Sequence, residues 1–172
     1  DVFFVISGFI IHYLYRQVKS PDASYFLKRL NRIYPLYWLY SALTLLAFTV
    51  MGNSFAEIDA EQDLIGSFAL IPINQAQLLP IGWTLVHELY FYLVYGLVLF
   101  APSRWRLPLL GLWGAVTIAS ILFGREGWSM WAALALSPFN LLFLAGVLMA
   151  EFFSVAQRYK LVGAMFALFG FA

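Results

Sequence analysis

The sequence contains no cysteine and few charged residues. The absence of cysteine among 172 residues excludes disulfides, thiol catalysis and cysteine-ligated metal sites. Only 11% of the residues are charged, whereas soluble globular domains carry about 25%. The formal net charge of +1 gives no field that would indicate nucleic acid as a partner. With 63% hydrophobic residues and no room for a separate soluble domain, the composition indicates an integral membrane protein.

Both ends of the sequence lack the features of natural chain ends. The chain begins at Asp1 without a start methionine or the charged n-region of a signal peptide. Asp1 and Ala172 both lie in apolar runs. We therefore expect a fragment of a longer protein, with one membrane span upstream of Asp1.

The apolar runs predict an all-α integral membrane protein, a multi-spanning helix bundle that forms a single domain. A span needs about 20 apolar residues. Pro35 would lie in the first turn of the second span, where proline is tolerated. The apolar part of residues 64–80 is too short to cross a bilayer, which favours an interfacial or re-entrant piece. The six predicted segments, of which the first and last are truncated, are 1–15, 33–51, 82–101, 107–123, 128–150 and 161–172.

The distribution of charge supports this layout. If the polar connection 16–32 is cytoplasmic, alternation places the acidic loop 52–63 outside and Arg104, Arg106, Arg158 and Lys160 inside. Nine of the ten Lys and Arg residues then lie inside, and only Arg125 does not. This is the positive-inside rule. A further span at 64–80 would break the alternation.

Glu88 lies in the middle of an apolar, aromatic stretch that runs from Ile81 to Gly96. Placing a carboxylate in hydrocarbon costs several kcal/mol, so such a residue is a functional-site hypothesis by default. On a helix, Thr84, Tyr92 and Tyr95 share the face of Glu88. The alternative is a carboxylate that only holds helix register through these hydroxyls. His87 points elsewhere, and it could be a core residue or a site residue; Phe91 excludes a His-Glu-x-x-His zinc motif.

Two further motifs contain polar residues near span ends. The first, Asp1-Val-Phe-Phe-Val-Ile-Ser-Gly-Phe, places Ser7 beside Gly8, which indicates either a helix-packing notch or a cavity wall. The second, residues 26–38, holds Lys28, Arg29 and Arg32 just before Tyr34-Pro35. These cations could be a topological anchor. They could also bind an anion at a helix N-terminus that begins near Pro35.

Together the motifs resemble a known family. Asp-x-Phe-Phe-x-x-Ser-Gly-Phe, Arg-x-x-Arg-Ile-x-Pro and Trp-Thr-Leu…Glu…Phe-Tyr occur here in order over residues 1–95. They resemble motifs of the membrane acyltransferase-3 family, in particular its exopolysaccharide O-acetylase branch. The resemblance implies a multi-pass enzyme of the bacterial inner membrane that transfers an acetyl or similar group. The donor would be cytosolic acyl-coenzyme A, and the acceptor a hydroxyl of a glycan or lipid-linked glycan.

The resemblance also implies roles for individual residues. Arg29 and Arg32 would bind the phosphates of the donor, and Glu88 would orient or polarise a catalytic partner. The family's catalytic His lies on the first helix, after an Arg, and neither His12 nor His87 matches it. We therefore expect the 172 residues to be inactive without an upstream span. No metal or bound cofactor is expected, acyl-coenzyme A being a cosubstrate. The remaining pocket residues would be Asp1, Ser7, Trp83 and Tyr92.

A different class of function competes with this interpretation. Glu88 and His87 could be the proton-coupling pair of a transporter or flippase-like module. Such carriers show repeated halves and broken helices at matching positions, and the sequence shows no internal repeat. A membrane scaffold would explain the basic anchor but not two adjacent ionisable residues within a span. Labelled acetyl transfer by the full-length protein would distinguish an enzyme from both alternatives.

Overall fold

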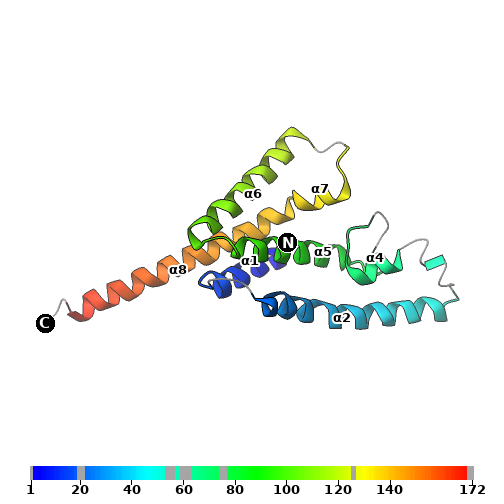
Figure 1. Ribbon diagram of the computed structural model, residues 1–172. Coiled ribbons are helices and arrows are strands. Elements are labelled where there is room, and N and C mark those ends of the chain that lie inside the picture. The colour runs from blue at the N-terminus through cyan, green and yellow to red at the C-terminus, as the bar shows by residue number, and fades with distance from the viewer. Residues whose placement is uncertain are drawn as a thin grey trace.

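The computed structural model describes residues 2–18, 22–52, 57–58, 63–73, 77–124 and 127–169; at 23, 154 and 156–169 it describes the backbone only. The described residues contain helices and no strand, which confirms the predicted all-α class. In Figure 1, α1 and α5 occupy the centre, while α2 and α8 extend to opposite sides. The helices are α1 (Val2–Tyr15), α2 (Ala23–Val50), α4 (Leu64–Ala69), α5 (Gly82–Leu99), α6 (Ser103–Phe123), α7 (Met130–Ala135) and α8 (Phe139–Phe169).

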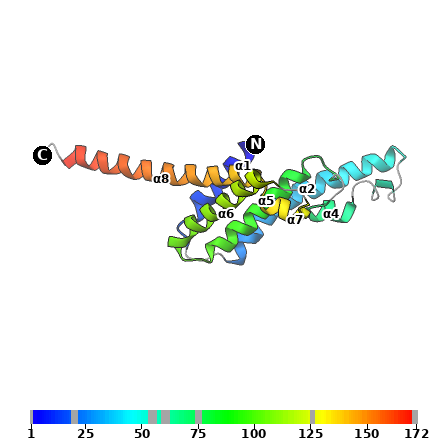
Figure 2. The same cartoon turned by 90° about the horizontal axis from the view of Figure 1, so that it is seen from above.

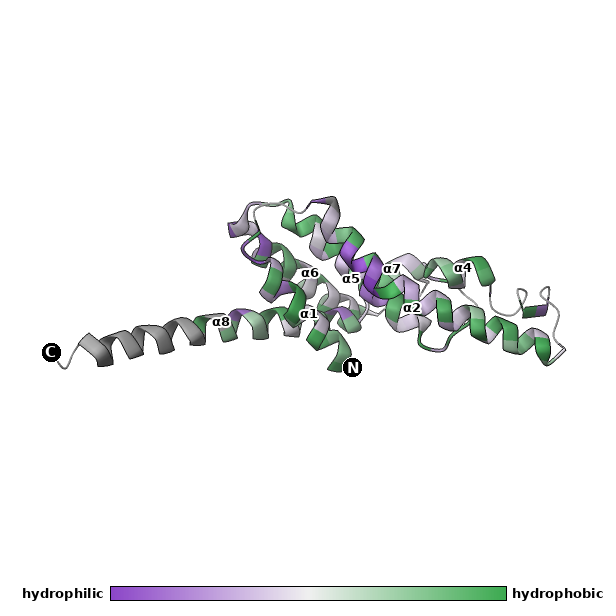
Figure 3. Ribbon diagram, turned by 90° about the horizontal axis from the view of Figure 1, so that it is seen from below, coloured by the Kyte–Doolittle hydropathy of each residue, from purple (hydrophilic) through white to green (hydrophobic). Residues whose placement is uncertain are grey.

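Three stretches within the described helices are long and apolar enough to cross a membrane. They are Ser24–Val50, Ser103–Phe123 and Met130–Phe153. The helix α1 is shorter, and α5 has 18 residues that include His87, Glu88 and three tyrosines. Large apolar side chains of α2, such as Leu39 and Leu46, are more than half exposed, as expected for surfaces that face lipid. Coloured by hydropathy, α2 is hydrophilic in its first part and mostly apolar beyond it (Figure 3).

The predicted polar connection at 16–32 is wrong from Ala23 onward, where the chain is already helical. The helix α2 begins at Ala23, where the Asp22 carboxylate accepts a hydrogen bond from the Tyr25 amide and caps the first turn. Pro35 therefore lies inside the helix and not in its first turn. Lys28, Arg29 and Arg32 are on the helix itself. An anion site at a helix N-terminus beside Pro35 is consequently excluded, since no helix begins there.

Other helix boundaries also differ from the predicted segments: two expected loops are helical, and one expected span is interrupted. The turn expected at Arg104 and Arg106 is the first turn of α6. The predicted segment 128–150 is interrupted between α7 and α8, where Pro138 cannot donate a backbone hydrogen bond. The loop expected at 158–160 is helical, because α8 continues to Phe169 through residues that favour helix. The short α4 agrees with the expectation of a piece too short to span.

Among the described helices, α1 and α8 make the most extensive contact (Figure 2). A Cβ atom on Gly8 would lie 2.1 Å from the Phe143 carbonyl oxygen, and one on Gly146 would lie 2.0 Å from the Val5 carbonyl oxygen. Only glycine permits the two backbones to approach this closely. The predicted packing role of Gly8 is therefore confirmed.

The side-chain contacts fix the relative directions of the helices. Ser7 and His12 of α1 pair in order with Glu88 and Tyr95 of α5, so these helices are parallel. His12 also meets Glu151, which lies further along α8 than the Phe143 partner of Phe4. Thus α1, α5 and α8 run in one direction. The helices α2 and α6 run in the opposite direction, because Tyr25, at the start of α2, meets Tyr92 and Gly96 in the second half of α5, and Arg106, at the start of α6, meets Leu99.

Arg106 holds the ends of α1 and α5 beside the start of α6. Its Nη1 donates to the carbonyl oxygens of Arg16, at 3.3 Å, and Val18, at 2.7 Å. Its Nε and Nη2 donate to Ala101 and Leu99, at 3.1 and 2.8 Å. Carbonyl groups at helix C-termini lack intrahelical donors and carry partial negative charge, so a guanidinium stabilises both helix ends.

Candidate active site

Glu88 is buried at the contact between α1 and α5, with 1% of its surface exposed. Its Oε1 accepts a hydrogen bond from Ser7 Oγ at 3.1 Å and a second, short one from the Tyr92 hydroxyl. Tyr92 lies one turn further along α5, which is why the two side chains meet. The Thr84 hydroxyl donates instead to the Ile81 carbonyl, and Tyr95 bonds to His12. Of the hydroxyl neighbours predicted for Glu88, only Tyr92 bonds to it.

Both donors bind the same carboxylate oxygen of Glu88. No described residue bonds to the second oxygen, Oε2. The Glu88 side chain lines a cavity of about 420 Å³ between α2 and α5, and Arg32 lines the same cavity. The structure therefore brings together the two residues that the sequence assigned to donor binding and catalysis. The other lining residues are mostly apolar: Phe3, Ile33, Leu36, Tyr37, Tyr40, Leu79, Ile81 and Leu85.

Arg29 lies one turn before Arg32 on α2, and its guanidinium faces the rings of three tyrosines. Its guanidinium carbon is 5.2 Å from the ring centre of Tyr15, 5.5 Å from that of Tyr92 and 5.9 Å from that of Tyr25. Arg29 is 8% exposed, and its Nε has no hydrogen-bond partner among the described residues. Cation–π contacts offset only part of the cost of burying a charge. An anion would complete this arrangement.

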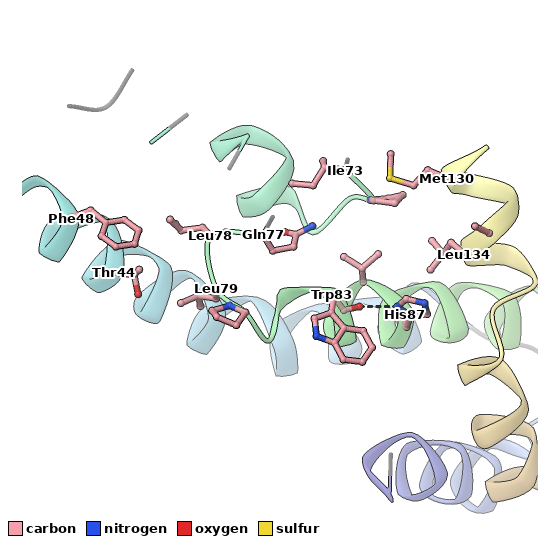
Figure 4. Close-up of a pocket in the computed structure, with 14 residues that line it drawn as sticks. Thr44, Phe48, Ile73, Gln77, Leu78, Leu79, Trp83, His87, Met130 and Leu134 are labelled. Atoms are coloured by element: carbon pink, nitrogen blue, oxygen red, sulfur yellow. Dashed lines mark hydrogen bonds between the residues drawn. The ribbon is translucent and has the colours of Figure 1, made fainter. Parts of the chain in front are cut away.

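Trp83 and His87 line a different cavity from Glu88. This cavity has a volume of about 730 Å³ and lies among α2, α5, α7 and the segment before α5 (Figure 4). His87 Nδ1 is 2.8 Å from the Trp83 carbonyl oxygen, and its Nε2 is 3.1 Å from Ser137 Oγ. Since a carbonyl only accepts, Nδ1 carries the proton and Ser137 donates to Nε2. The structure thus places Trp83 outside the cavity of Glu88, and both His87 nitrogens are occupied.

The sequence interpretation missed a second polar cluster. His12 is 3% exposed, and its Nε2 is 2.6 Å from Glu151 Oε1 on α8. Its Nδ1 is 2.8 Å from the Tyr95 hydroxyl. The available signal was an ionisable residue on each of two apolar helices. Of the predicted pocket residues, Asp1 lies outside the described part of the chain.

Comparisons with known proteins agree with the motifs. The acyltransferase-3 family, described as an acyltransferase domain, matches residues 1–172. The chain belongs to this family. It is 32% identical over 159 residues to the exopolysaccharide production protein ExoZ of Rhizobium meliloti (strain 1021). That alignment covers 88% of this chain and 49% of the relative, so the chain spans about half the length of ExoZ. No solved structure matches the chain significantly.

Proposed function

We propose that the protein is a membrane-bound O-acyltransferase that moves an acetyl or similar group from cytosolic acyl-coenzyme A to hydroxyls of an exopolysaccharide. The acceptor would be the glycan or its lipid-linked form, and the protein would lie in the bacterial inner membrane. Family membership and the similarity to ExoZ support acyl transfer and a polysaccharide acceptor. The observation that carries the proposal is the cavity that Glu88 and Arg32 share.

The chemistry of acyl transfer explains why these residues lie together. A hydroxyl that attacks a thioester must lose its proton, and negative charge develops on the carbonyl oxygen. One carboxylate oxygen of Glu88 accepts hydrogen bonds from Ser7 and Tyr92, and the other has no partner among the described residues. In the proposed reaction Oε2 accepts a hydrogen bond from the attacking hydroxyl or from the base that deprotonates it. The fixed position of Oε1 keeps the carboxylate oriented without substrate.

The cationic residues would bind the other substrate. The guanidinium groups of Arg32, on the cavity wall, and Arg29, in its tyrosine cage, can each bind two oxygens of a phosphate. The apolar lining between Arg32 and Glu88 suits the uncharged arm and acyl group of the donor. No bound cofactor or metal is required, because the coenzyme enters and leaves as a substrate.

Labelled transfer in membranes that contain the full-length protein tests the proposal. Membrane vesicles receive acetyl-coenzyme A with a labelled acetyl group and the exopolysaccharide precursor, and ester-linked label in the glycan is measured after separation. We expect label that is released by mild base and that depends on the protein. Vesicles that move protons or glycan but form no ester would instead indicate the transporter, and the enzyme proposal would be wrong.

A further inference from the structure

The cavity of about 730 Å³ shares Leu79 with the cavity of Glu88. On α2, the cavity of Glu88 is lined by residues between 32 and 40, and the larger cavity is lined by Thr44 and Phe48. The two cavities therefore follow one another towards the end of α2. In the predicted topology this end lies on the outer side of the membrane. A glycan that approaches Glu88 from that side along α2 passes the larger cavity first.

Three side chains that line the larger cavity have hydrogen-bonding groups without a partner among the described residues. Gln77 Oε1 is buried and accepts no hydrogen bond there, although Gln77 Nε2 donates to the Ile71 carbonyl oxygen at 3.1 Å. The Thr44 hydroxyl and the Trp83 indole N–H make no hydrogen bond with a described residue. Figure 4 shows these side chains on α2, on the segment before α5 and on α5. Because a buried acceptor without a donor is costly, the arrangement indicates a ligand with hydroxyl groups.

The start of α5 holds Gln77 in place. A Cβ atom on Gly82 would lie 2.9 Å from Gln77 Cβ and 3.3 Å from Gln77 Oε1. The amide side chain therefore lies directly against the helix, where position 82 has no side chain. This contact fixes Oε1 before a ligand arrives, which lowers the ordering cost of binding.

The chemistry of the lining favours a neutral sugar. No described residue that lines the cavity is Asp, Glu, Lys or Arg, so a phosphate or a uronate would meet no counter-charge. Trp83 is 43% exposed, and its ring offers a flat surface to the C–H groups of a sugar ring. Both nitrogens of His87 are bonded within the protein, so His87 offers no polar contact. A lipid chain would suit the apolar lining but would leave Gln77 Oε1 unpaired.

We propose that this cavity binds a neutral sugar unit of the acceptor glycan, next to the unit that is acylated. The inference rests on the proposed function and names a part of the acceptor that Glu88 does not contact. Thr44 lies eight residues after Leu36, which lines the cavity of Glu88. This is about 12 Å along the α2 axis, a distance that a short oligosaccharide spans. The site would select glycans by their hydroxyl groups, since a ligand that lacks them leaves buried polar groups unpaired.

The first test measures kinetics of the full-length protein in nanodiscs, with short oligosaccharides of the glycan as acceptors. Thr44→Val keeps the shape of the side chain and removes its hydroxyl, and Trp83→Ala removes the ring. We expect the acceptor KM to rise by about threefold to tenfold in Thr44→Val and by about tenfold in Trp83→Ala. The donor KM and kcat should stay unchanged. An unchanged acceptor KM in both variants would overturn the proposal.

Two controls belong to this test. Trp131→Ala removes an indole of α7 that is 59% exposed and does not line the cavity, so the acceptor KM should stay that of the parent. A monosaccharide acceptor occupies only the cavity of Glu88. Its KM should therefore be equal in the parent and in Thr44→Val. An equal rise in KM for the monosaccharide and the oligosaccharide would contradict a separate sugar site.

Binding without a donor distinguishes failure of this proposal from failure of the proposed function. Isothermal titration measures the Kd of the oligosaccharide for the parent, Thr44→Val and Trp83→Ala. Weaker binding in both variants, in a protein that transfers no acyl group, would support the sugar site and contradict the proposed function. Acyl transfer by the parent, with equal Kd in all three proteins, would contradict the sugar site alone. Displacement of the oligosaccharide by a polyprenyl phosphate without sugar would assign the cavity to a lipid chain and overturn the proposal.

Discussion

Three buried charged residues, Glu88, Arg106 and Arg29, differ in how their hydrogen-bonding groups are satisfied. Glu88 receives two hydroxyl donors on one oxygen, and Arg106 donates to carbonyl groups at two helix ends. The guanidinium of Arg29 packs against the faces of aromatic rings, and its Nε has no acceptor among the described residues. A buried charged group whose hydrogen bonds are all made within the protein suits a structural role, whereas a buried group that lacks a partner indicates a ligand. This criterion supports the proposal that Arg29 and the second carboxylate oxygen of Glu88 contact substrate.

Arg32→Ala tests whether the cationic wall of the cavity binds the donor. Loss of a bidentate contact to phosphate should raise the donor KM by about tenfold or more and leave the acceptor KM unchanged. Lys at this position should restore donor binding only in part, because it lacks the planar pair of donors. Steady-state kinetics with each substrate varied in turn measure both constants. If Arg32→Ala inserts normally and keeps the donor KM, the residue is a topological anchor only.

At the scale of helices, packing depends on small residues and capped ends. The α1–α8 crossing requires glycine at two places, and the start of α2 requires Asp22. The sequence predicted the first from the Ser-Gly notch. It failed on the second, because Arg and Lys residues were read as a connection although they favour helix. The break before Pro138 could have been predicted from the Ser137-Pro138 pair, which favours a turn, but the stretch around it is apolar enough to be read as one span.

Gly146→Ala should weaken the contact between α1 and α8. The new Cβ would lie 2.0 Å from the Val5 carbonyl oxygen, and the backbones would have to separate. We expect a loss of about 1–3 kcal/mol in stability, measured as thermal unfolding in detergent. Gly111→Ala is the matched control, since nothing lies within 4 Å of its Cβ and alanine favours helix. Equal destabilisation by both variants would contradict the packing role.

The stabilisation that the Asp22 cap gives to the first turn of α2 should depend on pH. The hydrogen bond from the Ser24 hydroxyl, followed by that from the Tyr25 amide, lowers the pKa of the Asp22 carboxyl below its usual range. The cap therefore contributes fully above the unfolded-state pKa and is lost as the pH falls through the lower folded-state pKa. Hydrogen exchange of the first-turn amides, corrected for intrinsic rates, should show this loss of protection. Asp22→Asn caps about as well without titrating, so the same acid-induced loss in that variant would be inconsistent with this account.

At the scale of the whole molecule, the charge pattern and the packing agree on the direction in which each helix runs. The helices α1, α5 and α8 run one way and α2 and α6 the other, as in the predicted alternation. The side of the membrane at which each end lies stays a prediction. The motifs singled out Glu88 and Arg32 separately, and the fold places both on one cavity. The His12–Glu151 pair was not foreseen, because its members are 139 positions apart and only the fold of α8 against α1 joins them.

Cysteine labelling tests the topology on a background that contains no cysteine. Gln17 and Met51, both exposed, lie just beyond α1 and at the far end of α2. The positive-inside rule predicts that cysteine at 17 reacts from the cytosol and cysteine at 51 from the opposite side. A membrane-impermeant maleimide applied to oriented vesicles measures each. Reaction of both positions from the same side would show that α2 does not cross the membrane.

The central claim is that the carboxylate of Glu88 takes part in acyl transfer. The most direct measurement compares Glu88→Gln with His87→Gln in the full-length protein, by labelled acetyl transfer and by membrane insertion. The two residues are adjacent but line different cavities. Both variants should insert as well as the parent, since a neutral amide is cheaper to bury than a carboxylate. The account predicts that Glu88→Gln loses about a hundredfold or more of the activity and that His87→Gln keeps most of it. Full activity in Glu88→Gln would make Glu88 a structural residue and contradict the account.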